Sequence, residues 1–146
     1  MIRRMTAFDL DAFLPYRLAK LANRVSRGFS AEYSASFGLS IPEWRVMAHL
    51  SQSDAVSVRE LHLMADLEKS KASRAATRLE AAGLIEKRIS PTDRRLVELS
   101  LSPKGNAMMA ELIPIAFKYE ADVLKSLNPE ERDMLDRLIG RLLQTA

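Results

Sequence analysis

The fold is decided by the stretch Ser70-Lys71-Ala72-Ser73-Arg74-Ala75-Ala76-Thr77-Arg78-Leu79-Glu80-Ala81-Ala82-Gly83. At about 100° per residue, the spacing of an α-helix, its small and apolar residues fall on one side. They are Ala72, Ala75, Ala76, Leu79, Ala82 and Gly83. The other side carries hydroxyls and cations, namely Ser70, Lys71, Ser73, Arg74, Thr77 and Arg78. We expect a helix that lies close against its neighbours and turns a basic side to solvent.

A second short helix is predicted just before this stretch. Ser57-Val58-Arg59-Glu60 has the pattern of a serine N-cap with an acid three residues later. The helix that it opens carries Leu61, Met64 and Ala65. Two short helices, the second basic on its outer side, predict a helix-turn-helix.

A β-hairpin is predicted directly after the basic helix. Leu84–Ile89 and Leu96–Leu101 have strand character, and the second alternates clearly at Val97, Leu99 and Leu101. The residues between them, 90–95, start with turn chemistry and end with two arginines. A hairpin in this place predicts a winged helix with a basic wing tip, in which Lys87 and Arg88 are solvated strand residues.

Longer helices are predicted on both sides of this lobe. One runs from Leu10 to about Phe37, and Ser40-Ile41-Pro42-Glu43 starts the next. After the hairpin, Ser102-Pro103-Lys104-Gly105 starts a helix that Pro114 should kink, and Asn128-Pro129-Glu130-Glu131 starts the last one. The predicted fold is mainly α with a small β-hairpin wing, in one domain over 1–146. We place the winged-helix lobe at about 40–101, and the flanking helices at about 8–37 and 103–146.

The last helix carries an apolar stripe that lacks an obvious partner in the chain. Its members are Leu135, Leu138, Ile139, Leu142 and Leu143. We expect the terminal helices to form a two-fold homodimer, since closed symmetry is the usual way to cover such a stripe. The alternative is a monomer whose terminal helices fold back on themselves.

Length and composition exclude several classes of protein. The 146 residues suit one domain, with 47% hydrophobic and 28% charged residues and no cysteine. The longest apolar run, Leu112–Phe117, is too short for a membrane span, and we expect neither a signal peptide nor a membrane partner. Without cysteine there are no disulfides and no thiol-based sensing, so we expect a reducing compartment, most simply the cytoplasm.

The positive charge is concentrated in one segment. The net charge is only +3, but residues 69–95 contain eight bases and three acids. Such a local excess is typical of a surface that binds a polyanion, although a merely solvated basic surface has the same composition.

Catalytic and metal-binding motifs are missing from the sequence. The five glycines stand apart, so no phosphate-binding loop or dinucleotide fingerprint exists, and we expect no cofactor and no enzyme. The only histidines, His49 and His62, lie on different predicted helices. A metal site is not expected.

The chain resembles the MarR family of winged-helix transcription regulators over nearly its whole length. Residues 93–105, Asp93-Arg94-Arg95-Leu96-Val97-Glu98-Leu99-Ser100-Leu101-Ser102-Pro103-Lys104-Gly105, match the family pattern D-x-R-x-x-x-L-x-L-[TS]-x-x-G. Residues 78–85 are similar to its R-L-x-x-x-G-L-[IV] junction between recognition helix and wing, and 41–47 to the opening of its second helix.

The resemblance implies a dimer with recognition helices in successive major grooves of DNA and wings in the flanking minor grooves. The residues assigned to DNA binding are Lys69, Ser70, Lys71, Ser73, Arg74, Thr77, Arg78, Asp93, Arg94 and Arg95. Arg95 is then the wing arginine and Asp93 the carboxylate that orients it. Two alternatives remain: Ser70 also suits a helix N-cap, and Asp93 with Arg95 also suits a simple hairpin salt bridge.

The resemblance also implies an effector, a small phenolic or aromatic acid bound between the dimer helices and the DNA-binding lobe. Tyr16 and Trp44 would stack on its ring, and Arg17 or Lys20 would meet its carboxylate; His49 completes the candidates. Trp44 as a core residue and His49 as a surface residue are the alternatives.

We therefore expect a sequence-specific binder of double-stranded DNA that acts as a dimeric repressor on a near-palindromic operator. A winged-helix module that binds protein instead of DNA is the alternative. The basic side of the predicted recognition helix disfavours that alternative, because a protein-binding helix should expose apolar anchors.

Overall fold

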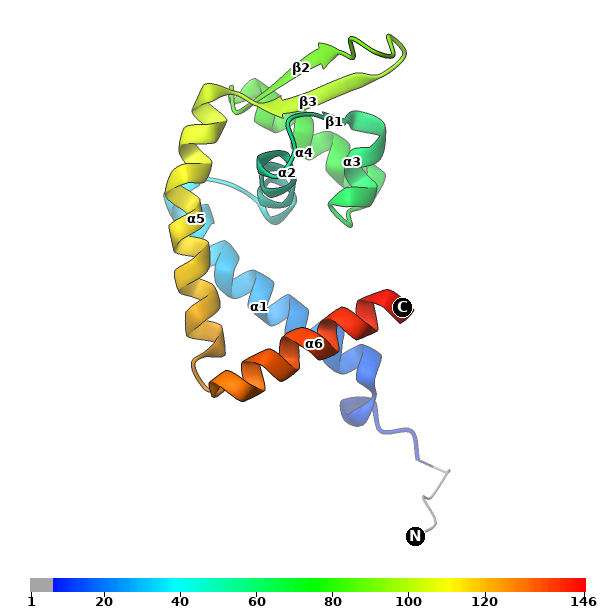
Figure 1. Ribbon diagram of the computed structural model, residues 1–146, viewed down its shortest axis with the longest axis vertical. Coiled ribbons are helices and arrows are strands. Elements are labelled where there is room, and N and C mark those ends of the chain that lie inside the picture. The colour runs from blue at the N-terminus through cyan, green and yellow to red at the C-terminus, as the bar shows by residue number, and fades with distance from the viewer. Residues whose placement is uncertain (1–6) are drawn as a thin grey trace. The chain divides into compact units, whose positions relative to one another are not determined.

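The computed structural model describes residues 7–146 and consists mainly of helices (Figure 1). The elements in chain order are a 3-10 turn (Leu10–Ala12), α1 (Leu14–Phe37), α2 (Ile41–Ser51), β1 (Val56–Ser57), α3 (Val58–Met64), α4 (Lys69–Ala81), β2 (Ile85–Ile89), β3 (Val97–Leu101), α5 (Pro103–Leu124) and α6 (Pro129–Thr145). The predicted fold class, mainly α with a small wing, is confirmed.

The chain divides into two compact units, one up to Ala110 and the other Glu111–Ala146. The first contains the 3-10 turn, α1 to α4, the sheet and the start of α5; the second contains the rest of α5 and α6. The prediction of one domain over 1–146 stays a prediction.

The sheet has three antiparallel strands in the order β1-β3-β2, where the sequence had predicted only a hairpin. Val56 of β1 pairs with Leu99, and Ser57 pairs with Glu98. On the other edge of β3, the register runs from Ile85 opposite Leu101 to Ile89 opposite Val97. Strand β1 has two residues, too few for any alternation to be visible in the sequence.

Helices α2, α3 and α4 pack with this sheet around the main core (Figure 1). Its fully buried side chains come from each of these elements: Val46, Met47, Leu61, Leu79, Ile85 and Leu99. The predicted inner side of α4 is confirmed at Ala72, Ala75, Ala76 and Leu79, each no more than 3% exposed. The prediction was wrong for Ala82 and Gly83, which are exposed because α4 ends at Ala81.

Three predicted helix starts differ in detail. The first helix begins at Leu14, after a 3-10 turn, since Pro15 fits only the first turn of an α-helix. Ser57 precedes α3 as predicted, but its side chain makes no capping hydrogen bond. The suggestion that Ser70 caps α4 is wrong: Glu68 is the N-cap residue and Ser70 lies inside the helix.

The structure explains why glycine is needed at two positions of the matched motifs, 83 and 105. Gly83 follows α4 in a left-handed conformation, with a φ of +74°. The N–H of Leu84 donates to the carbonyl of Leu79, so the helix ends in a Schellman-type motif, which favours glycine at position 83. A Cβ on Gly105 would collide with the backbone carbonyl of Leu84. Ser102 caps this start of α5 by accepting a hydrogen bond from the N–H of Gly105 (3.0 Å).

The second unit ends in an exposed amphipathic helix. The predicted start of α6 is confirmed as a capping box between Asn128 and Glu131. None of the residues of α6 is buried. Helix α5 continues through Pro114 to Leu124. Within residues 7–146, no helix combines the length and apolar character that a membrane crossing requires.

Candidate nucleic-acid interface

Helix α4 presents its predicted basic side to solvent. All of Lys69, Ser70, Lys71, Ser73, Arg74, Thr77 and Arg78 are exposed. Lys71, Arg74 and Arg78 line a hollow of about 300 Å³ together with Ser40 and Pro42 at the start of α2. The alanines on the opposite side of α4 hold its backbone close to α2 and α3, so the positions of these cations are set by the packing of the helix.

The start of α4 shares a second hollow with the wing. Lys69 and Ser73 line a space of about 310 Å³ together with Arg95, which lies in the loop between β2 and β3. Arg59 and His62 of α3 line it as well. The recognition helix and the wing arginine therefore border one cationic depression.

Most of the α4 cations lack an acidic partner. Arg78 lies 4.0 Å from the carboxylate of Glu43, at the limit of an ion pair, and its side chain is 71% exposed. Lys69, Lys71 and Arg74 form no ion pair with any other residue in the range 7–146. Their charges are thus available to an external anion.

The hydroxyls of α4 are less available than the cations for binding a phosphate. The Thr77 hydroxyl donates to the carbonyl of Ser73 at 3.0 Å, one helical turn back. A phosphate would need this proton, so Thr77 must exchange one hydrogen bond for another to contact DNA. Ser70 and Ser73 are exposed on the same helix.

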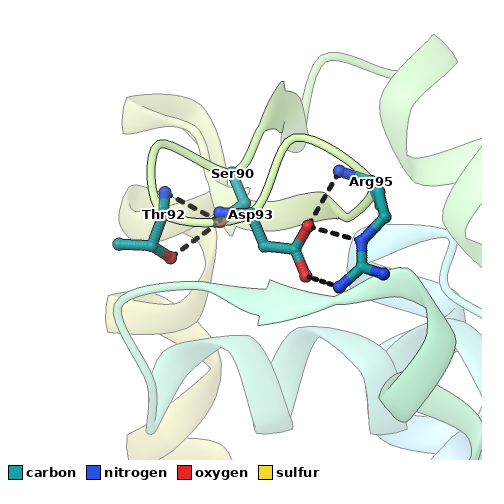
Figure 2. Close-up of polar contacts among 4 residues, drawn as sticks. All are labelled: Ser90, Thr92, Asp93 and Arg95. Atoms are coloured by element: carbon teal, nitrogen blue, oxygen red, sulfur yellow. Dashed lines mark hydrogen bonds and ion pairs between the residues drawn. The ribbon is translucent and has the colours of Figure 1, made fainter.

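On the wing, the arginine is fixed by its neighbour. The Oδ1 of Asp93 accepts from the Nε of Arg95 and its Oδ2 accepts from Nη2, both at 3.1 Å (Figure 2). These side-chain bonds, followed by one from the Arg95 backbone N–H, lower the pKa of Asp93 below its ordinary value. The Arg95 side chain is nevertheless 88% exposed. Arg95 can therefore keep its salt bridge with Asp93 and still be accessible to a ligand. Arg94 is also exposed.

Lys87 and Arg88, both on β2, pair with acids of the protein itself. Arg88 contacts Glu98, its cross-strand neighbour, at 3.3 Å, and Lys87 lies 3.7 Å from Glu80. This agrees with their prediction as strand residues.

Three residues at the interface were not predicted from the sequence: Ser57, Arg59 and His62. All three line the hollow beside Arg95. The Oγ of Ser57 is buried there and has no hydrogen-bond partner among the described residues. Only the pairing of β1 with β3 brings this segment near the wing, and no local pattern signals that pairing.

Of the five predicted effector residues, three line one groove within the described chain. Tyr16, Arg17 and Lys20 line a groove of about 310 Å³ along α1, and the Lys20 ammonium lies 5.8 Å from the centre of the Tyr16 ring. Trp44 instead stacks on Tyr33 (5.7 Å between centroids) and meets Phe29 edge to face. His49, in the last turn of α2, does not line this groove.

The aromatic cluster around Trp44 serves the core. Tyr33 is 1% exposed, and burial raises its pKa to about 12, with the nearby Arg45 opposing the shift. Trp44 itself is half-buried, so its contacts fit the alternative of a packing residue, and its role in stacking on a ligand stays a prediction. Over residues 7–146, no three metal-ligating side chains cluster.

Comparison with known proteins finds similarity to regulators of transcription. A model of the MarR family matches residues 37–96. The transcriptional repressor MprA of Escherichia coli K12 is 29% identical over 92 residues, which cover 63% of this chain and 52% of MprA. The chain thus matches about half the length of that relative.

Solved structures match over most of the chain. A MarR/EmrR family regulator from Acinetobacter sp. ADP1 has a TM-score of 0.84 and 25% identity, covering 94% of this chain and 97% of the other. The Bordetella bronchiseptica protein BpsR, whose DNA binding is regulated by 6-hydroxynicotinic acid, has a TM-score of 0.82 and 23% identity, covering 93% and 96%.

These relatives are named as regulators of transcription and not as enzymes, in agreement with the sequence-based prediction. The matched family model, the repressor relative and the shared fold lead to the same result. Over residues 37–96 the chain is similar to the MarR family, and its fold is shared with solved regulators of that family.

Proposed function

We propose that this protein binds double-stranded DNA sequence-specifically and represses transcription as a homodimer on a near-palindromic operator. One observation carries the proposal: Lys69 and Ser73 of α4 border the same cationic depression as Arg95 of the wing. A surface of this kind can contact phosphates and bases on neighbouring grooves at once.

The residue types suit the two grooves. Arginine forms a planar fork that matches the edge of guanine, so Arg74 and Arg78 are suited to reading bases in the major groove. The negative potential of a narrow minor groove favours an inserted cation, which Arg95 supplies. The lysines and serines of α4 are suited to phosphates, which fix register rather than sequence.

A role in protein binding is less well supported. Apart from Ala81, every exposed residue of α4 is polar or charged. Such a helix has no apolar anchor for a protein groove. Failure of the parent protein to bind any DNA duplex would favour this alternative.

Dimerisation is supported by the apolar stripe of α6. Leu135, Leu138, Ile139 and Leu142 are 37–48% exposed, and Leu143 is 74% exposed. A second copy would remove this surface from water. Analytical ultracentrifugation should show twice the chain mass of 16.4 kDa, and a stable species of 16.4 kDa at micromolar concentration would contradict the dimer.

For the effector we propose an aromatic acid that meets Arg17 or Lys20 in the groove along α1. The support is the cationic groove beside Tyr16 and the 6-hydroxynicotinic acid of the Bordetella regulator. Thermal-shift measurements with phenolic acids test this. If a phenolic acid raised the melting temperature of Arg17→Ala as much as that of the parent, the proposed effector site in the groove would be wrong.

The DNA proposal is tested by fluorescence anisotropy on an A·T-rich duplex of about 30 base pairs, enough for two half-sites one helical turn apart. Arg74→Ala and Arg95→Ala should each weaken binding about tenfold or more. Lys125→Ala removes an exposed cation in the second unit and should leave the affinity unchanged. Equal affinity of all four proteins would refute the proposed interface.

A further inference from the structure

A buried serine stands at the base of the wing. Ser90 is 2% exposed, and it follows directly after β2. Together with Ser102, it makes up the buried polar residues of the described chain. Burying a hydroxyl without hydrogen-bond partners is unfavourable, so the partners of Ser90 indicate what its hydroxyl does.

The Ser90 side chain organises the first half of the wing loop. Its Oγ accepts from the backbone N–H groups of Thr92 (3.4 Å) and Asp93 (3.2 Å), and it shares a hydrogen bond with the Thr92 hydroxyl (3.2 Å). The Ser90 N–H donates to the carbonyl of Leu96 at 2.9 Å and closes the loop. The hydroxyl therefore fixes the backbone at Asp93.

Asp93, like Ser90, accepts hydrogen bonds within the wing loop, in this case from Arg95. Its Oδ1 accepts from the backbone N–H of Arg95 at 3.1 Å and from the Nε of the same residue at 3.1 Å. Figure 2 shows the result, a chain of hydrogen bonds that leads from Ser90 through Asp93 to the Arg95 guanidinium. Without this chain, a side chain that is 88% exposed would sample many rotamers.

We propose that Ser90 is a positioning residue for DNA binding, which holds Asp93 so that Asp93 can hold the Arg95 guanidinium in the orientation that meets DNA. The proposal rests on the proposed function for its DNA part. The hydroxyl is the required group, because one Oγ accepts from two backbone N–H groups at once and alanine offers no acceptor.

Ser102 provides a matched control. It is buried to a similar degree, at 5% exposure, and its hydroxyl also makes two hydrogen bonds, to the carbonyl of Gly83 and from the N–H of Gly105. These bonds lie at the start of α5 and not in the wing loop. Loss of Ser102 should therefore affect stability without affecting Arg95.

The first experiment uses the free protein, so it does not depend on DNA. NMR detects the Nε–H of Arg95, which should exchange slowly with water in the parent because Asp93 accepts it. Ser90→Ala should accelerate this exchange several-fold, while Ser90→Thr and Ser102→Ala should not. Circular dichroism confirms that each variant is folded. Unchanged exchange in Ser90→Ala would overturn the positioning role.

The second experiment is a double-mutant cycle in affinity for the same A·T-rich duplex. Ser90→Ala should weaken binding about fivefold, roughly the equilibrium equivalent of one neutral hydrogen bond. In the Arg95→Ala background it should have no effect, since Ser90 acts through Arg95. An equal loss in both backgrounds would show a general structural role and overturn the proposal.

The two experiments separate two kinds of failure. If Arg95→Ala binds DNA like the parent, the wing contact in the proposed function is wrong, and Ser90 has no role in DNA binding. The exchange measurement still decides whether Ser90 holds Arg95 in the free protein.

Discussion

Helix α4 and the wing loop both present arginine to solvent, but they position it by different means. On α4, the cations stand on a helix whose alanine side is buried, and Lys69, Lys71 and Arg74 form no ion pair within the described residues. In the wing loop, Pro91, Thr92, Arg94 and Arg95 are exposed, and Asp93 and Ser90 hold Arg95 by hydrogen bonds.

This difference predicts which substitutions should disturb the arginines of α4 and which should disturb the arginine of the wing. Arginine on α4 depends on the volume of residues beneath the helix, so substitutions in the core should disturb it most. Arginine on the wing depends on polar groups of Ser90 and Asp93, so small polar changes there should disturb it while stability stays nearly constant.

The largest effect is expected on the buried side of α4. Ala76 is 2% exposed, and Ala76→Leu should lower the free energy of unfolding by about 3 kcal/mol, because a well-packed core resists added volume. Urea denaturation measures it. Ala81→Leu, at the exposed end of α4, is the matched control and should change stability by less than about 0.5 kcal/mol. Similar values for both would show that α4 is not closely packed.

Base discrimination should depend on Arg74. Arg74→Ala should reduce the preference for the operator over random duplex by about 1–3 kcal/mol, the value of a bidentate contact to guanine. Binding-site selection from a random library, followed by competition titration, measures the preference. Arg74→Lys retains the charge but not the fork, so it should recover general affinity and not preference. Full preference in Arg74→Lys would mean that Arg74 contacts only phosphate.

For the wing, removing a negative charge should weaken DNA binding. Asp93→Asn increases the net positive charge, and general electrostatics alone would strengthen binding to a polyanion. Loss of the charged partner of Arg95 should instead weaken it about threefold to tenfold. Anisotropy titration decides the sign. Tighter binding would show that Asp93 does not orient Arg95 for DNA.

The pH dependence of the wing follows from the lowered pKa of Asp93. Hydrogen bonds from Arg95 favour the carboxylate, so the contribution of this pair is present above the ordinary aspartate pKa of about 4 and is lost only as the pH falls through the lower folded value. The ratio of parent to Asp93→Asn affinity should therefore stay constant from about pH 8 to pH 5. A ratio that decreases across this range would contradict the assignment.

The smallest effect is expected for Arg88. It pairs with Glu98 on the sheet surface, and exposed pairs of this kind contribute about 0–1 kcal/mol. Arg88→Ala should change neither stability nor DNA affinity by more than about 0.5 kcal/mol. A tenfold loss of affinity would extend the interface onto β2.

The sequence predicted the composition of the interface better than its geometry. The periodicity of α4 separated buried alanines from exposed cations, since a helix converts spacing directly into direction. The start of that helix was missed, because the preceding turn, with Asp66 at a φ of 51°, lets the helix begin at Lys69 and leaves Ser70 inside it.

Features that depend on long-range pairing could not be predicted. Arg59 and His62 lie near the wing through the pairing of β1 with β3 and the packing of α3 on β3, and β1 has no pattern of its own. For Trp44 the sequence left a ligand site and the core as alternatives, and only the structure shows its contacts with Phe29 and Tyr33. The role of Ser90 emerges only from the backbone groups that its hydroxyl meets.

The most direct test of the shared α4 and wing surface is the salt dependence of DNA binding. If the two elements together neutralise six to ten phosphates per dimer, affinity should fall by about 10³ to 10⁵ between about 50 and 200 mM salt. Arg95→Ala should reduce the slope by about one per subunit. An affinity that hardly changes with salt, or the same slope in parent and variant, would contradict a joint DNA-binding surface.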